Sequence, residues 1–358
     1  MDPFTTFPYT DHTEHLSYYE EDYIGWNESW RLLKPTQDSQ VTKIVSLAIY
    51  SIMLLLGITG NGLVICLTGF GMKKTVTTIW YLNLAVADFL FTICLSSEIA
   101  YTALDRWVLG RMLCKLDSVV SFLNMFASVF FLTTISVDRC ISVVHPVWAL
   151  NHRTPQVASV MAAFNWAAAF VLSSPYFSFR VMEYLPGDLV QCRYNFISED
   201  ISDLTDWHPT MVMTEFVVGF LIPFVTILVC YGSIIIKLKG KIFGRFSRSF
   251  KVIVAVVLAF FCCWFPFHLF AILDVLKSDS PEMEEVLMTG TELSKGLVCL
   301  NSCLNPLLYA FLGTRYRKTN WQSFLSGLKG NFDERWAVST FPSHRTSSTT
   351  SGMESGML

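Results

Sequence analysis

Seven stretches of the chain are apolar over more residues than the roughly 20 that an α-helix needs to cross a bilayer. They lie at residues 44–70, 78–103, 111–144, 157–178, 209–237, 249–275 and 288–312. Helices on the surface of a soluble protein carry a polar face, and most of these stretches lack one. Only 15% of the residues are charged, against about 25% in a typical soluble protein. The chain is therefore predicted to be an all-α membrane protein, a seven-transmembrane helix bundle.

Basic residues gather on one side of this predicted bundle. The joint at 237–251 holds six Lys and Arg residues and no acid. Residues 1–40 hold eight acids against two bases, and residues 180–206 hold six acids against two. Short loops that carry Lys and Arg stay in the cytoplasm. The N-terminus is therefore expected to be extracellular and the C-terminus cytoplasmic.

These spans divide the chain into four predicted parts. Residues 1–43 form an acidic extracellular tail, residues 44–312 the bundle, and residues 327–358 a disordered cytoplasmic tail. Residues 313–326 form a short amphipathic eighth helix that rests on the bilayer. Its apolar side chains are Tyr316, Trp321, Phe324 and Leu325.

Two features are expected on the extracellular side. Seven of the ten cysteines lie inside apolar runs, where a free thiol behaves as a small hydrophobe. Cys114 and Cys192 lie in polar flanks on the predicted outer side, and we expect them to form the one disulfide. The sole N-glycosylation sequon begins at Asn27 on the same side, so Asn27 is the predicted glycan acceptor.

Polar side chains also lie deep inside the predicted spans. Asp88 is in the middle of the second, and two pairs of residues four apart share a helix face, Asn124 with Ser128 and Asn301 with Asn305. A carboxylate with amide and hydroxyl oxygens nearby can hold a small hard cation. The same residues can instead join helices by hydrogen bonds. The residues alone leave both interpretations open.

Four prolines interrupt the apolar stretches, at Pro175, Pro223, Pro266 and Pro306. A proline inside a helix removes a backbone hydrogen bond and kinks the helix. The bundle is therefore predicted to contain kinked helices.

One marker in each predicted helix resembles the rhodopsin-like (class A) G-protein-coupled receptors. The markers are Gly60-Asn61, Leu84–Asp88, Asp138-Arg139-Cys140, Trp166, Pro223 with Tyr231, Cys263–Pro266 and Asn305–Tyr309. Within that family, the segments "LDRWVLGRMLCK", "SVDRCISVVHPVWALNHRT" and "CCWFPFHLF" are similar to the chemoattractant subgroup, above all to chemerin and formyl-peptide receptors. The C-terminal segment "STFPSHRTSSTTSGMESGML" looks most like the chemerin receptor.

The resemblance implies a plasma-membrane receptor that is not an enzyme. Its ligand would be a chemoattractant peptide or small protein, and it would signal through the G protein Gi in leukocyte chemotaxis and inflammation. Receptor kinases and arrestin would be further partners, acting on a phosphorylated run in the tail. That run consists of Thr346, Ser347, Ser348, Thr349, Thr350 and Ser351. No nucleic-acid partner is expected.

The resemblance also assigns roles inside the bundle. Arg139 would be the G-protein switch, held by Asp138 at rest and covered by Tyr231 and Tyr309 in the active state. The residues that relay ligand binding would be Val129, Pro223, Phe260, Trp264 and Pro266. An allosteric Na⁺, the one cofactor considered, would be held by Asp88, Asn124, Ser128, Asn301 and Asn305.

For the ligand, the resemblance implies that Arg180 receives a terminal carboxylate. Lys295 would lie on the opposite wall and Trp264 would contact the ligand. The candidates for binding cationic groups are Glu98, Glu215, Asp274 and Glu292. Glu215 stands where formyl-peptide receptors carry arginine, which weakens a formyl-peptide interpretation.

Other functions are weighed against this one. A receptor for a lipid inflammatory mediator remains an alternative, and so does a non-signalling scavenger receptor. A light receptor is excluded because Cys299 aligns with the lysine that would bind retinal. Internal repeats, typical of many transporters, are absent from the sequence. No motif for a catalytic nucleophile or a metal-dependent enzyme is found in the chain.

Overall fold

A computed structural model describes residues 37–186, 189–197, 206–238, 248–276 and 280–313. It divides into two compact units, Met1–Ile49 and Tyr50–Leu358. The described part of the first unit, residues 37–49, is the beginning of a helix that continues into the second. The second unit contains the bundle described below.

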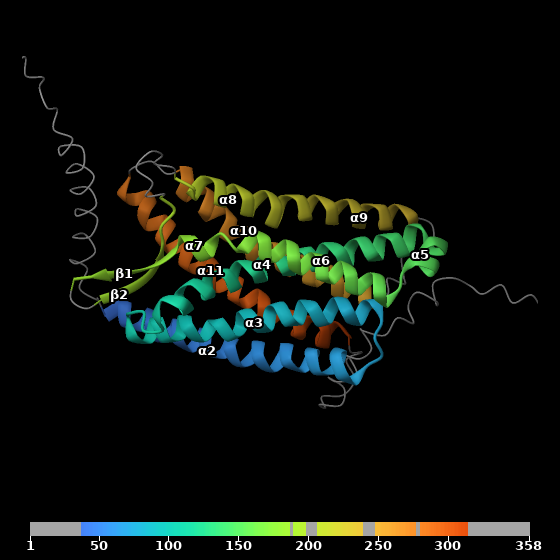
Figure 1. The fold of residues 1–358 in the computed structure, drawn as a ribbon, viewed down its shortest axis with the longest axis horizontal. Coiled ribbons are helices and arrows are strands. Elements are labelled where there is room, and N and C mark those ends of the chain that lie inside the picture. Colours follow the sequence, from blue (N-terminus) through green and yellow to red (C-terminus); the bar gives the residue numbers. More distant parts are fainter. Residues whose placement is uncertain (1–36, 187–188, 198–205, 239–247, 277–279, 314–358) are drawn as a thin grey trace, which may run out of the picture. The chain divides into compact units, whose positions relative to one another are not determined.

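Long helical segments account for all seven predicted spans (Figure 1). Within the described ranges they are α2 (Gln37–Cys66) extended by the π-helical turn η1 (Leu67–Gly71), α3 (Val76–Leu104), α4 (Gly110–Val144), α6 (Pro155–Ser173), α8 (His208–Phe216) continued through the π-helical turn η2 (Val217–Leu221) into α9 (Ile222–Leu238), α10 (Arg248–Leu276) and α11 (Pro281–Gly313). Two short helices, α5 (Pro146–His152) and α7 (Tyr176–Phe179), lie on either side of α6 in the sequence. The seven-helix bundle is confirmed.

Six helices in the described part of the chain are long and apolar enough to cross a membrane. The seventh predicted span lies in α11, whose first turn carries Glu282 and Glu284 and is therefore more polar. Large apolar side chains are exposed on the surface of the bundle, including Leu55 on α2 and Phe164 on α6. Lipid chains can cover such a surface, whereas water would not favour it.

The four prolines differ in their effects. Pro175 lies between α6 and α7, and Pro223 follows directly after Ile222, the residue that succeeds η2. Proline donates no backbone hydrogen bond, and a π-helical turn is one way in which a helix accommodates a local irregularity. Pro266 and Pro306 lie inside α10 and α11, which continue past them.

A β-hairpin departs from the all-α expectation. Strand β1 (Arg180–Leu185) pairs antiparallel with β2 (Leu189–Tyr194), with Arg180 opposite Tyr194. The hairpin and helix α5 lie at opposite ends of the bundle (Figure 1). We therefore refer to the hairpin end and the α5 end. The sequence gives little sign of these strands, because they lie outside the membrane-length apolar stretches and have little polar–apolar alternation.

The disulfide predicted between Cys114 and Cys192 is present, with the two Cα atoms 5.8 Å apart. It joins β2 to the first turns of α4. The backbone N–H of Trp107 also donates to the carbonyl oxygen of Val190 at 2.7 Å. The hairpin is thus attached to the bundle at two points.

Helix α4 is the central element of the bundle, since it packs against α3, α6 and α9. Its side chains Phe126, Phe131 and Ile135 are almost completely buried. Trp166 on α6 donates from Nε1 to Oδ1 of Asn83 on α3 at 2.9 Å. These contacts fix the relative positions of α3, α4 and α6.

Helices α10 and α11 approach each other closely where Gly290 faces Phe270. A Cβ atom placed on Gly290 would lie 2.1 Å from Cε1 of Phe270 and 2.2 Å from its Cζ. Both distances are far below a van der Waals contact. A side chain at this position would therefore force the Phe270 ring or the two helices to move.

We predict that Gly290→Ala lowers the thermal stability of the purified protein by about 1–3 kcal/mol, the usual cost of overpacking a core. Gly296→Ala on the same helix is the matched control, because nothing lies within 4 Å of a Cβ atom added there. Alanine favours a helix over glycine by up to about 1 kcal/mol, so the control should be neutral or stabilising. Equal unfolding midpoints for the two variants would contradict the packing argument.

Candidate functional site

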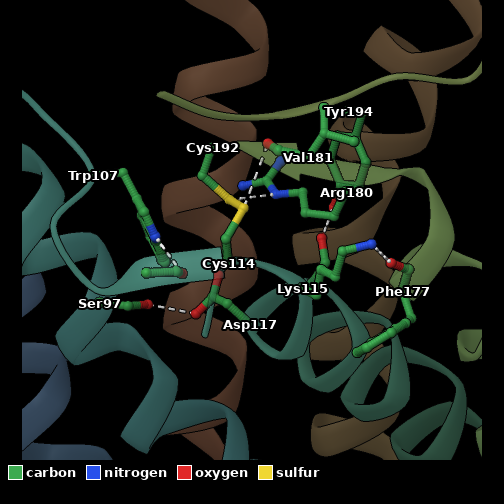
Figure 2. Close-up of a disulfide and its surroundings, with 12 residues drawn as sticks. Ser97, Trp107, Cys114, Lys115, Asp117, Phe177, Arg180, Val181, Cys192 and Tyr194 are labelled. Atoms are coloured by element: carbon green, nitrogen blue, oxygen red, sulfur yellow. Dashed lines mark hydrogen bonds between the residues drawn. A yellow bond between two sulfur atoms is a disulfide. The ribbon is translucent and has the colours of Figure 1, made fainter. Parts of the chain in front are cut away.

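Arg180 lies at the hairpin end beside the disulfide (Figure 2). It follows α7 directly and is the first residue of β1. Its Nε donates to Sγ of Cys192 at 3.0 Å, and its guanidinium carbon lies 4.3 Å from the centre of the Tyr194 ring. No carboxylate among the described residues forms an ion pair with Arg180. Its positive charge is therefore positioned by a sulfur atom and an aromatic face, not neutralised.

Acidic side chains lie near this arginine. Glu98 on α3 and Glu292 on α11 both act electrostatically on the Tyr101 hydroxyl, as does Lys295. Lys295 Nζ donates to Oε1 of Glu292 at 2.7 Å, and both side chains are more than half exposed. The structure thus brings three of the predicted ligand residues together, although Lys295 already has a protein partner.

Asp117 on α4 is a further member of this group that the sequence analysis did not select. It accepts a hydrogen bond from Oγ of Ser97 on α3 (Figure 2). The charges of Glu98 and Arg180 also act on it. Its position three residues after the disulfide cysteine Cys114, at the beginning of a span, was the available signal in the sequence.

Two other predicted ligand residues have protein partners. Asp274 Oδ2 on α10 lies 3.7 Å from Nε2 of His208, the first residue of α8, and forms an ion pair when that imidazole is protonated. Glu215 on α8 is buried and accepts a hydrogen bond from the Tyr176 hydroxyl. Tyr176 in turn stacks on Phe122 of α4, with ring centres 3.5 Å apart. Glu215 therefore lies within the bundle and not on an open surface.

The predicted relay residues lie deeper. Val129, Phe260 and Trp264 belong to one buried cluster, and the Phe260 and Trp264 rings are 5.8 Å apart. His268, one helical turn after Trp264, is also buried, and its ring centre lies 6.2 Å from that of Trp264. A movement of the Trp264 side chain would have to displace its neighbours, because protein interiors are close-packed.

The five residues predicted to hold Na⁺ are all buried in the middle of the bundle. Asp88 accepts a hydrogen bond from Nδ2 of Asn305 at 2.7 Å, and Oγ of Ser128 lies 3.5 Å from its other oxygen. The side-chain amide of Asn124 donates from Nδ2 to Oγ of Ser128 and to Oδ1 of Asp88, each at 3.2 Å. Both polar atoms of the Asn301 side chain lack a partner among the described residues.

This group of oxygen atoms has the chemistry of a cation site. Asp88 supplies the negative charge, and hard cations prefer carboxylate, amide and hydroxyl oxygens. A buried polar atom without a partner is costly, and Oδ1 of Asn301 and Oδ1 of Asn305 are two such acceptors among the described residues. The residues present therefore fit a small cation.

Asp138 and Arg139 lie together at the α5 end, with Nε of Arg139 3.7 Å from Oδ2 of Asp138. Arg139 is 4% exposed, so it is less accessible than its position at a helix end suggested. Two further residues join this group, and the sequence analysis selected neither. Thr77 on α3 accepts a hydrogen bond from Nη2 of Arg139, and Arg153, just after α5, contacts Asp138.

Several predicted sites lie outside the described residues. They are the glycan acceptor Asn27, the eighth helix beyond residue 313, the phosphorylation run Thr346–Ser351 and the side chain of Tyr309. These remain predictions from the sequence. Tyr231, the other tyrosine expected over the switch, is partly buried on α9.

Comparison with known proteins decides the family. The family model of the 7 transmembrane receptor (rhodopsin family) matches residues 60–309, more than half of the chain. The chain belongs to this family. It is therefore a multi-pass membrane receptor that couples an extracellular ligand to a G protein, and not an enzyme.

Individual relatives are similar to the receptor over most of its length. It is 40% identical to the bovine (Bos taurus) Chemerin-like receptor 1, over 90% of this chain and 92% of that protein. It is 41% identical to the mouse (Mus musculus) Formyl peptide receptor 2, over 78% and 83%, respectively. It is also 41% identical to the human (Homo sapiens) Chemerin-like receptor 2, over 76% and 77%. The resemblance stated from the motifs is confirmed.

We predict that Tyr176→Phe destabilises the receptor by about 1–3 kcal/mol, because it leaves the buried Glu215 carboxyl group without its hydroxyl partner. The phenyl ring keeps the stacking on Phe122. Replacing both partners, Tyr176→Phe with Glu215→Met, should restore most of the stability, since no polar group then remains unpaired. Thermal unfolding of the three variants measures this, and a double variant less stable than the single one would refute it.

Proposed function

We propose that the receptor binds a chemoattractant peptide or small protein at the hairpin end and signals through Gi in leukocyte chemotaxis and inflammation. The observation that carries this proposal is Arg180, a positioned guanidinium for which no described residue supplies a carboxylate. An arginine can hold a carboxylate through two parallel hydrogen bonds. The terminal carboxylate of a peptide is such a group, and relatives at 40% identity are named chemerin-like receptors.

The surrounding acids support a peptide with basic residues. Glu98, Asp117 and Glu292 lie near the hairpin end, and residues 1–40 carry eight acids against two bases. Such a surface attracts cationic ligands over long range. A ligand with a basic body and an anionic terminus satisfies both the acidic groups and Arg180.

The proposed location is the plasma membrane, with the hairpin end outside the cell. The Cys114–Cys192 disulfide at that end favours an oxidising compartment. The basic joint at 237–251 favours a cytoplasmic position for the opposite side. Phosphorylation of Thr346–Ser351 by receptor kinases, followed by arrestin binding, belongs to the same proposal.

A lipid inflammatory mediator is the second candidate, because the carboxylate or phosphate of a lipid would also pair with Arg180. The acidic side chains around Arg180 favour a ligand with cationic groups and so argue for the peptide. A non-signalling scavenger receptor is less compatible with the buried charged group around Arg139 at the α5 end. Coupling to a G protein gives a reason for these costly buried charges, and a receptor that does not couple to a G protein lacks that reason.

We predict that Arg180→Ala weakens the response to a C-terminal chemerin peptide by about 10- to 100-fold, the loss expected for a hydrogen bond to a charged group. The measurement is the pertussis-toxin-sensitive fall in cyclic AMP, at matched surface expression. Arg193→Ala is the control, because Arg193 is paired with Glu183 at 2.6 Å on the same hairpin. Amidating the C-terminus of the peptide should weaken the response of the Arg180→Ala receptor little further.

Two results would overturn this assignment. One is an unchanged response of the Arg180→Ala receptor, and the other is an equal loss in Arg193→Ala. A response to lipid mediators but not to the peptide would select the second candidate. Uptake of the peptide without any fall in cyclic AMP would select the scavenger.

We also propose that Na⁺ binds at Asp88 and stabilises the resting receptor. The support is the buried group of oxygen atoms from α3, α4 and α11, including acceptors without a protein partner. A cation that binds the folded receptor raises its stability by mass action.

We predict that replacing NaCl by choline chloride lowers the unfolding midpoint of the receptor, and that Asp88→Asn abolishes this difference. Asp117→Asn, which removes a carboxylate near the hairpin end, should leave the Na⁺ dependence intact. A persistent Na⁺ effect in Asp88→Asn would place the ion elsewhere.

A further inference from the structure

Asp138 is in contact with two arginines, and the closer one is not its neighbour in the sequence. Nε of Arg153 donates to Oδ1 of Asp138 at 2.7 Å, and Nη2 of Arg153 donates to Oδ2 at 3.2 Å. Nε of Arg139 lies 3.7 Å from Oδ2. Arg153 therefore engages both carboxylate oxygens, while Arg139 makes one longer contact.

The two contacts differ in kind. Two parallel hydrogen bonds from one guanidinium to one carboxylate form the strongest arrangement of such a pair. A separation of 3.7 Å is longer than a normal N–H···O hydrogen bond, so the Asp138–Arg139 contact is mainly Coulombic. Arg139 makes a short hydrogen bond elsewhere, from Nη2 to Oγ1 of Thr77 at 2.6 Å. Thr77 also accepts from Nη2 of Arg153 at 3.2 Å.

The three charged side chains of this arrangement are largely buried. The side chains of Asp138, Arg139 and Arg153 are 10%, 5% and 17% exposed. Charges that are largely removed from water interact more strongly than surface charges and are costly to leave without a partner. If Arg153 were removed, Arg139 would be the ion-pair partner left to the Asp138 carboxylate among the residues that the structure describes.

Arg153 also connects helix α5 to the bundle. It is the first residue after α5, and its backbone N–H donates to the carbonyl oxygen of Ala149 in that helix. Its side chain reaches back to Asp138 on α4 and Thr77 on α3. The contact therefore fastens the far end of α5 to two helices of the bundle.

We propose that Arg153 is a positioning residue for G-protein coupling. By occupying both oxygens of Asp138, it keeps that carboxylate from closing on Arg139, whose short hydrogen bond goes to the uncharged hydroxyl of Thr77. Arg139 is then released more easily than a full Asp138–Arg139 ion pair would allow. This inference rests on the proposed signalling function and adds a residue to it.

Three substitutions are expected to change G-protein coupling in defined directions. Arg153→Ala should lower coupling, because Asp138 then pairs directly with Arg139. Thr77→Val should raise ligand-independent coupling, because Arg139 loses its short hydrogen bond. Asp138→Asn should also raise it, and should cancel the effect of Arg153→Ala in the double variant. A purely structural role for Arg153 would predict losses throughout.

The first test needs no ligand. Thermal unfolding of the full-length receptor in nanodiscs is compared for Asp138→Asn, Arg153→Ala and their double variant, and for the corresponding cycle with Arg139→Ala. The double variant Asp138→Asn with Arg153→Ala should be no less stable than the less stable of its two single variants. The interaction free energy between Asp138 and Arg153 should also exceed the one measured between Asp138 and Arg139. Additive shifts in the Arg153 cycle, or a larger coupling to Arg139, would overturn the proposal.

The second test measures nucleotide exchange on purified Gi, with and without a C-terminal chemerin peptide. Arg153→Ala should need about tenfold more peptide, as expected for loss of one charged hydrogen-bonded pair. Arg153→Lys, which keeps the charge but not the two parallel bonds, should fall between Arg153→Ala and the unsubstituted receptor. Lys74→Ala is the control, because Lys74 is an exposed basic residue in the joint before α3.

The outcomes separate this inference from the proposed function. Unchanged exchange in Arg153→Ala, or a full tenfold loss in the Asp138→Asn background, would overturn the role of Arg153. If the peptide elicits nothing from the unsubstituted receptor, the proposed ligand is wrong. The unfolding cycle with Arg153 still decides on Arg153 in that case.

Discussion

The hydrocarbon of a bilayer offers no hydrogen bonds, so a chain that crosses it must satisfy every backbone N–H and C=O group internally. This constraint makes each spanning segment of the receptor a helix and confines the β-hairpin to one end of the bundle. It also makes any polar side chain within the spans costly unless other polar groups surround it. Several of the buried charged and amide side chains are accordingly gathered into groups.

Three such groups lie at different levels of the bundle, and each uses a different device. At the hairpin end, Arg180 rests on an aromatic ring and a disulfide sulfur, which orient its charge without neutralising it. In the middle, Asp88 lies among uncharged oxygen donors, a setting that suits a small cation. At the α5 end, Asp138 shares its charge between two arginines. The protein therefore balances the charge of Arg180, Asp88 and Asp138 to three different degrees.

Much of the functional site follows from the sequence because its residues stand in fixed positions on long helices. The residues at 124 and 128 share a face of α4 by helical geometry alone, and both indeed lie near Asp88. The predicted disulfide followed from polarity and sidedness. Arg153 and Thr77 could not be found in this way. Thr77 accepts a hydrogen bond from Arg139, which lies 62 residues away in the chain, and Arg153 reaches Asp138 across the intervening helix α5.

The sequence by itself determined the seven helices, their approximate limits and the family, because the length and apolarity of a span are local properties of the chain. Only the tertiary structure decided which charges have partners. Glu215 and Lys295 looked equally available for a ligand, yet one is buried against Tyr176 and the other is paired with Glu292. An ion pair or a hydrogen bond depends on distances of a few ångströms between side chains, and those distances are set by how the helices pack.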